Sequence, residues 1–166
     1  NYELETLDFR FNLRPKPVTT DNVVLIEIGD DTIRNFGQWP ITRNYHALLI
    51  KALSEARAGS IIFDIFFSEP HPGDEKLAEA IKNARNVYLP HVLNVDPKAP
   101  GKSVLASGFS AQSLPLLTKN AKGTGHINII PDRDGKFRRV PLTIEYDNGF
   151  YPYLSFLVGC HVLGIP

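Results

Sequence analysis

The sequence predicts an α/β fold: a central sheet with a parallel βαβαβ first half and antiparallel hairpin strands in the second half, flanked by helices. Two apolar runs predict the parallel half, since Val23–Ile28 and Ser60–Phe66 are short and rich in β-branched or aromatic residues. A helical pattern lies between them, which gives one βαβ unit. Two turn signals, Asp132–Gly135 and Asp147–Gly149, predict the antiparallel half, and Asp-Gly is the strongest hairpin signal in the chain.

The helix expected between the two apolar runs has one continuous buried face. Thr42 is a suitable N-cap residue, and Gly59 lies where a left-handed C-cap residue belongs. The apolar residues between these ends repeat at helical spacing: Tyr45, Leu48, Leu49, Ala52, Leu53 and Ala56.

A second βαβ unit follows the Pro-rich loop after residue 68. Asp74 can cap a helix whose inner face carries Leu77, Ala78 and Ile81, and Val87–Leu93 is the third strand. Right-handed crossovers place the three strands in one parallel sheet. The carboxyl ends of these strands then lie along one edge, where open α/β sheets commonly bind ligands.

The second half of the chain has less periodic structure. Residues 94–117 are rich in Pro, Gly, Ser and Lys and are expected to form a long loop or flap. We expect strands at His126–Ile130 and Phe137–Tyr146, and an apolar helix at Tyr153–Leu163. At the other end of the chain, Tyr2–Leu13 fits both helical spacing and strand alternation, so both alternatives stay open.

Composition limits the class of protein. The length of 166 residues suits a single domain over residues 1–166, and 18 basic against 18 acidic residues argue against a nucleic-acid partner. The single cysteine, Cys160, excludes an internal disulfide, and no stretch reaches the roughly 18 apolar residues of a membrane span. Because the chain has no methionine, we expect it to be part of a longer protein.

Three carboxylates form the first candidate site. If the first two strands are adjacent and parallel, Asp30, Asp31 and Asp64 meet at one end of the sheet, where they can hold Mg²⁺ or Ca²⁺. In the alternative, Asp30 or Asp31 caps the turn after the first strand. Asp64, inside an apolar run, then needs a partner to offset its desolvation, and Arg43 or His46 can supply it.

Complete catalytic motifs are missing from the sequence. Receivers of response regulators carry their phosphoacceptor on the third strand with a lysine nearby, and haloacid-dehalogenase-type phosphatases need a second aspartate that Asp64–Phe66 lacks. The histidines show no metal-ligand spacing, and Gly123–His126 lacks the ending of a phosphate loop. We therefore expect no enzyme activity, no cofactor and no bound metal, with a Mg-dependent phosphoryl-transfer enzyme or receiver-like domain using the three aspartates as the alternative.

The chain resembles the CHASE2 sensory domain over nearly its whole length. No single motif is specific, but their order and spacing together are. The motifs that carry the resemblance are Val24–Asp31, Gly37–Pro40 with Arg43, Ile62–Pro70, Gly125–Asn128, Asp132–Gly135, Arg138–Leu142 and Tyr151–Phe156.

The resemblance implies an extracytoplasmic input module of a bacterial transmembrane receptor. Residues 1–20 would then be an N-terminal juxtamembrane segment, residues 151–166 a C-terminal helix leading towards the membrane, and the spans themselves would lie in flanking segments. The expected location is the periplasmic side of a bacterial inner membrane. The expected output domain is a histidine kinase or a nucleotide cyclase, and the expected assembly is a homodimer.

The expected ligand is a small molecule or another extracytoplasmic signal that biases an equilibrium between receptor states. A protein-interaction or dimerisation module with no small ligand is a further alternative. Trp39 either anchors its loop or lines the pocket, and of Arg138 and Arg139, which together could bind an anion, one is expected to be structural. The candidate ligand-binding residues are Asp30, Asp31, Trp39, Arg43, Asp64, His126 and Asn128.

Overall fold

The computed structural model describes residues 2–15, 22–37, 39–95 and 104–165. The chain divides into two compact units, Asn1–Trp39 and Pro40–Pro166. Among the residues that the structure describes, no helix combines the length and the apolarity that crossing a membrane requires.

The first unit contains two helices, α1 (Tyr2–Leu13) and α2 (Asp30–Phe36). The helical alternative for the N-terminal segment is thus confirmed. The strand predicted at Val23–Ile28 is wrong, because these residues have no regular secondary structure, and Leu25 is 89% exposed. Apolar composition favours a strand only where a neighbouring backbone supplies the hydrogen bonds, and the sequence pattern does not identify that neighbour.

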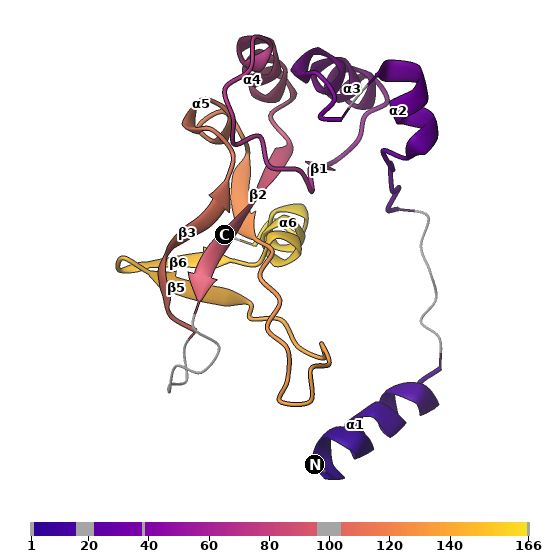
Figure 1. The fold of residues 1–166 in the computed structure, drawn as a ribbon, viewed down its shortest axis with the longest axis vertical. Coiled ribbons are helices and arrows are strands. Elements are labelled where there is room, and N and C mark those ends of the chain that lie inside the picture. Colours follow the sequence, from indigo (N-terminus) through magenta and orange to yellow (C-terminus); the bar gives the residue numbers. More distant parts are fainter. Residues whose placement is uncertain (1, 16–21, 38, 96–103, 166) are drawn as a thin grey trace. The chain divides into compact units, whose positions relative to one another are not determined.

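The second unit is built around a mixed sheet with β2 (Val87–Val95) at its centre (Figure 1). β1 (Ile61–Ile62) and β4 (Gly123–His126) pair with β2 in parallel, whereas β3 (Ala106–Gln112) pairs with it antiparallel. A separate antiparallel hairpin consists of β5 (Thr143–Tyr146) and β6 (Gly149–Pro152). The predicted α/β class, with parallel strands and a hairpin, is confirmed.

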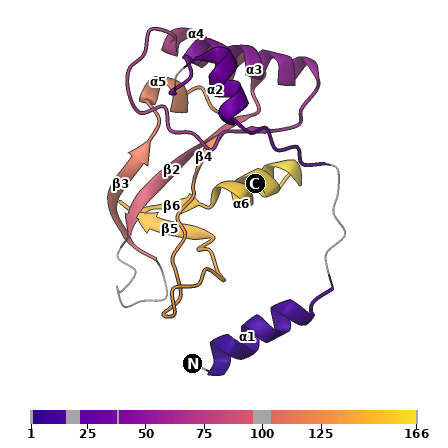
Figure 2. The same ribbon diagram turned by 45° about the vertical axis from the view of Figure 1, so that its right-hand side comes forward.

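Four helices belong to this unit: α3 (Arg43–Glu55), α4 (Asp74–Ala84), α5 (Pro115–Thr118) and α6 (Leu154–Val162). Figures 1 and 2 show α3, α4 and α5 towards one end of the sheet and the β5–β6 hairpin towards the other. The main core lies beside these three helices and consists of Ile50, Ile61, Phe63, Phe67, Leu77, Ala78, Ile81, Val87, Leu89 and Leu117.

The last helix, α6, packs against the sheet through a smaller apolar cluster of Tyr88, Leu154 and Val158. Gly125 on β4 makes this contact close, because a Cβ atom there would lie 2.5 Å from the Leu154 Cα atom. Only glycine lets the backbones of β4 and α6 approach to this distance.

Strand boundaries differ from the predicted ones where tertiary pairing decides them. Only Ile61–Ile62 of the predicted second strand is strand, and β4 ends at His126, where a strand was predicted to begin. The loop predicted for residues 94–117 is wrong at Ala106–Gln112, which form β3, while its residues 96–103 lie outside the described ones. Because β3 is rich in small and polar residues, its local sequence does not predict a strand. The strand forms because it pairs with β2.

The two predicted turns have different roles. Asp147 and Asn148 have φ values of 47° and 58° and form a two-residue connection between β5 and β6, as in a type I′ hairpin. Asp132–Gly135 is also a turn, closed by the Gly135 amide donating to the Asp132 carbonyl at 2.9 Å, but no strand flanks it. The hairpin prediction is therefore confirmed at the second turn alone.

Candidate functional site

A cluster of two histidines and four aromatic residues lies where the central sheet meets the β5–β6 hairpin. His91 on β2 and His126 on β4 are paired residues of the parallel ladder, so their side chains share one face of the sheet. They are 3% and 0% exposed. We call this set the histidine–aromatic cluster: His91, Phe109, His126, Tyr146, Tyr151 and Tyr153.

Edge-to-face ring contacts hold the cluster together. The His91 ring lies 5.3 Å from that of Phe109 on β3 and 5.6 Å from that of Tyr151 on β6. The His126 ring lies 5.3 Å from that of Tyr153, the residue before α6. Such pairs contribute about 0.5–1.5 kcal/mol each beyond the burial of their area. The hairpin and the start of α6 are thus anchored to the sheet through the two histidines.

Three of the four imidazole nitrogens of this pair are buried without a hydrogen-bond partner among the described residues. The unpartnered buried atoms are Nε2 of His91 and both ring nitrogens of His126. A buried polar group left without a partner costs about 1–3 kcal/mol. Burial lowers the pKa of each histidine to about 4, and the His126 imidazole beside it lowers the pKa of His91 further in the same direction. Both rings are neutral at pH 7.

Asn128, two residues after His126, continues the pairing of this edge with side-chain hydrogen bonds. Its Oδ1 accepts from the Leu93 backbone amide at 2.9 Å, and its Nδ2 donates to the Leu93 carbonyl at 2.7 Å. The side-chain amide of Asn128 therefore makes the two hydrogen bonds with β2 that a backbone would make if β4 continued.

A second buried polar group, Arg43, lies at the start of α3. Its Nε donates to Asp74 Oδ1 at 3.1 Å, its Nη2 donates to the Glu69 carbonyl at 3.2 Å, and its guanidinium lies 4.6 Å from the centre of the Phe67 ring. The other oxygen of Asp74 accepts from the His71 amide at 2.7 Å, in the loop before α4. We call this set the arginine anchor: Arg43, Phe67, Glu69, His71 and Asp74.

The partner predicted for Asp64 is wrong in this structure. Arg43 pairs with Asp74, and Asp64 is an exposed residue in the extended segment after β1. His46 contacts the rings of Phe63 and Phe67 instead, at 5.9 and 5.1 Å. Desolvation and the charge of Arg43 lower the pKa of His46. Because β1 ends at Ile62, the predicted burial of Asp64 is lost and its carboxylate stays in water.

Three of the predicted site residues, Asp30, Asp31 and Trp39, belong to the first unit and are exposed. Asp30 and Asp31 form the first turn of α2, where carboxylates interact favourably with the helix dipole. Asp31 Oδ1 also accepts from the Thr32 amide at 2.8 Å. In the part of the chain that the structure describes, no group of three or more His, Cys, Asp or Glu is arranged to hold a metal ion.

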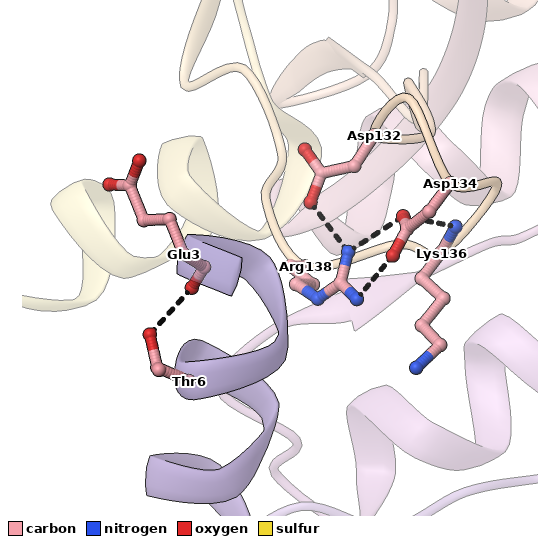
Figure 3. Close-up of polar contacts among 6 residues, drawn as sticks. All are labelled: Glu3, Thr6, Asp132, Asp134, Lys136 and Arg138. Carbon is pink, nitrogen blue, oxygen red and sulfur yellow. Dashed lines mark hydrogen bonds and ion pairs between the residues drawn. The ribbon is translucent and has the colours of Figure 1, made fainter. Parts of the chain in front are cut away.

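Arg138 stabilises the turn that carries Asp132 and Asp134 (Figure 3). Its Nη1 donates to Asp132 Oδ2 at 3.0 Å and its Nη2 to Asp134 Oδ2 at 2.7 Å, while the arginine side chain is only 5% exposed. The hydrogen bond from Arg138 lowers the pKa of Asp134 to about 2. Arg138 is therefore the structural member of the Arg138–Arg139 pair, as predicted.

Sequence reasoning found His126 and Asn128 but missed their surroundings. His91 carried a usable signal, because a histidine inside the apolar run Val87–Leu93 is as unusual as the aspartate that was noticed. Phe109 lies in the segment predicted to be a loop, and Tyr146, Tyr151 and Tyr153 become neighbours of the histidines only through the hairpin.

The fold and the cluster together define an α/β domain with a mixed sheet, whose core carries two buried histidines with unpartnered ring nitrogens among the described residues. The model of the family described as the CHASE2 domain matches residues 1–164, so the chain belongs to the CHASE2 family. CHASE2 domains are extracytoplasmic sensory domains of signalling receptors. Searches among curated proteins and among solved structures each found no match.

Proposed function

We propose that this chain is the periplasmic, ligand-binding domain of a bacterial transmembrane receptor, such as a histidine kinase or a nucleotide cyclase. The observation that carries the proposal is the histidine–aromatic cluster, in which buried polar atoms without partners adjoin the start of the last helix. Unsatisfied buried polar groups are expensive, so a molecule or a rearrangement that satisfies them changes the stability of this region.

The change would reach the output domain through the chain termini. A signal at His126 acts next to Tyr153, which precedes α6, and α6 would continue towards the membrane. A difference of a few kcal/mol between two arrangements of this region suffices to switch their populations. His126 and Asn128 are the predicted site residues that this proposal uses first, while Arg43 is already engaged by Asp74.

Assembly as a homodimer is part of the proposal. The first helix, α1, has no buried residue, and Phe9, Phe11 and Leu13 on it are 51–68% exposed. Exposed apolar side chains of this size commonly mark contact surfaces. Light scattering of the purified chain tests the dimer, and Phe11→Glu should give a monomer.

Cysteine labelling in the full-length gene product tests the receptor proposal. Cys160→Ala removes the single cysteine of residues 1–166, any cysteine elsewhere in the gene product is replaced by alanine as well, and Lys82→Cys then adds one on an exposed position of α4. A membrane-impermeant maleimide should label this cysteine in spheroplasts without lysis, and the Cys160→Ala protein should stay unlabelled. Labelling that needs lysis would place the domain in the cytoplasm and end the proposal.

A thermal-shift screen tests ligand binding. The purified chain is heated with a panel of amino acids, organic acids and sugars, and a ligand of this site should raise the unfolding midpoint in the parent but not in His126→Phe. Mg²⁺ belongs in the same screen: a gain that is lost in Asp64→Asn, joined to hydrolysis of p-nitrophenyl phosphate, would favour the phosphoryl-transfer alternative instead.

A further inference from the structure

We propose that the signal is the proton itself: the paired His91 and His126 form an acid-sensitive latch that holds the β5–β6 hairpin and the start of α6 on the sheet, and protonation releases them. This inference rests on the proposed function, because it names the stimulus that the sensory domain detects. It concerns a local equilibrium of the fold, however, and can be tested on the isolated chain.

The placement of the two rings makes their charged forms incompatible. His91 and His126 are ladder partners on adjacent strands, and adjacent strands lie about 4.8 Å apart. Two imidazolium ions on paired residues of one sheet face repel each other, and both are removed from solvent. In the closed arrangement the first proton therefore makes the second harder to add, and the two rings titrate as a coupled pair.

The groups that face the two rings offer no compensating negative charge. Phe109 of β3 and Tyr151 of β6 face His91, and Tyr153 faces His126. Burial and the other imidazole are what lower the pKa of His91, and burial is what lowers that of His126. Among the described residues, no carboxylate contributes to either shift, so the charged pair has no stabilising counter-charge there.

A proton fits this site better than a larger ligand. Aromatic rings contact each histidine at 5.3–5.6 Å, and the two histidines are 3% and 0% exposed. A groove of about 620 Å³ exists elsewhere in the same unit, between α3 and α4, and no member of the cluster lines it. A proton needs no cavity, and the unpartnered nitrogens are the atoms that accept it.

Release at His126 would be transmitted directly to α6. His126 and Tyr153 form an isolated β-bridge in addition to their ring contact, and Tyr153 is the N-cap residue of α6. The neighbouring Gly125 lies against Leu154, so β4 and the first turn of α6 move past each other only if this contact opens. Protonation of the buried His126 ring would therefore change the contacts of Tyr153, the residue that begins α6.

Amide hydrogen exchange of the isolated chain between pH 7 and pH 4 tests the latch. The protection factors of amides in Thr143–Tyr146 and Gly149–Pro152 should fall at least tenfold as the pH falls through 5, while those in α4 stay unchanged. In the double variant His91→Phe with His126→Phe, the hairpin should keep its protection at pH 4. His161→Gln, an exposed histidine whose ring contacts Tyr88, should behave like the parent.

Imidazole ¹⁵N spectra of the parent chain provide a second measurement that does not depend on the folding of the variants. His91 and His126 should gain their protons in the same pH range in which the hairpin loses protection, and the separate His46 signal shows whether the arginine anchor titrates there too. Three outcomes would overturn the latch: protection that does not depend on pH, loss of protection in α4 and the hairpin together, or hairpin opening while both rings are still neutral. None of them bears on the cysteine labelling, so failure of the latch and failure of the receptor proposal are distinguishable.

Discussion

The arginine anchor and the histidine–aromatic cluster are both buried polar groups in the same unit, yet they are satisfied to opposite degrees. Arg43 is charged and has hydrogen bonds to a carboxylate and a carbonyl, with an aromatic ring beneath its guanidinium. His91 and His126 are neutral and leave three ring nitrogens without partners among the described residues.

The difference shows where the fold is fixed and where it can respond. A buried charge that is paired with a carboxylate is costly to disturb, so the arginine anchor ties α3 to the start of α4 in one arrangement. A buried neutral pair loses its ring contacts when its surroundings open, but its unpartnered nitrogens gain solvation, and this gain is larger once the rings are protonated. The comparison therefore supports a structural role for the first region and agrees with the sensing role that we propose for the second.

The largest effect is expected from acid. The folded-state pKa of about 4 for each histidine lies below the ordinary value of 6.5, so the fold favours the neutral form. Stability is complete above pH 6.5 and falls as the pH drops from 6.5 to 4, by about 3 kcal/mol for each imidazole. Urea unfolding across this range measures the loss.

The double variant His91→Phe with His126→Phe supplies the control for that loss. In this variant the free energy of unfolding should depend much less on pH. A smaller pH dependence should remain because the pKa of His46 is lowered as well. An equally steep dependence in the double variant would contradict the assignment of acid sensitivity to the histidine–aromatic cluster.

Asp74→Ala should give the next largest effect. It leaves the buried Arg43 guanidinium without its carboxylate, and removing one partner of a buried ion pair costs about 3–5 kcal/mol. Chemical denaturation at pH 7 measures this cost. Lys51→Ala breaks an exposed pair with Glu55 at 4.0 Å and should change the free energy of unfolding by less than about 0.5 kcal/mol. Similar losses in both variants would mean that burial does not distinguish the two pairs.

Asn128→Ala should have an intermediate effect. It removes the two hydrogen bonds to Leu93 and leaves a backbone amide and a carbonyl unsatisfied, at a cost of about 1–3 kcal/mol. Asn128→Asp keeps the acceptor but loses the donor, so it should restore only part of the stability. Full stability in the alanine variant would show that Asn128 is free to contact a ligand.

Arg138→Ala should give the smallest change in overall stability but a clear local one. The Asp134 carboxyl, whose pKa is about 2 beside this arginine, should titrate near its ordinary value of 3.8 in the variant. Carboxyl ¹³C spectra measure the pKa directly. Lys122→Ala, an exposed lysine elsewhere in the unit, should leave the Asp134 titration unchanged.

Local patterns predicted the helices and turns well. The helix expected from Thr42 onwards is α3, the helix capped near Asp74 is α4, and Asp147–Asn148 close a hairpin. These features depend on residues a few positions apart, so the sequence contains most of their determinants. Two strand predictions were wrong: a strand was predicted at Val23–Ile28 and is absent there, and a loop was predicted at Ala106–Gln112, which form β3. Both errors have the same cause, because a strand depends on a partner strand that can lie anywhere in the chain.

The sequence by itself determined the α/β class, the three main helices, and the CHASE2 resemblance that the family match confirms. It predicted that one arginine of the Arg138–Arg139 pair is structural, and the structure decided that this is Arg138. Only the tertiary structure decided that Arg43 pairs with Asp74 and that His91 faces His126. Asn128 and the Leu93 backbone that it binds are 35 residues apart. Helical spacing is encoded within one or two turns, whereas these contacts exist only after β2 and β4 have paired and the hairpin has closed over them.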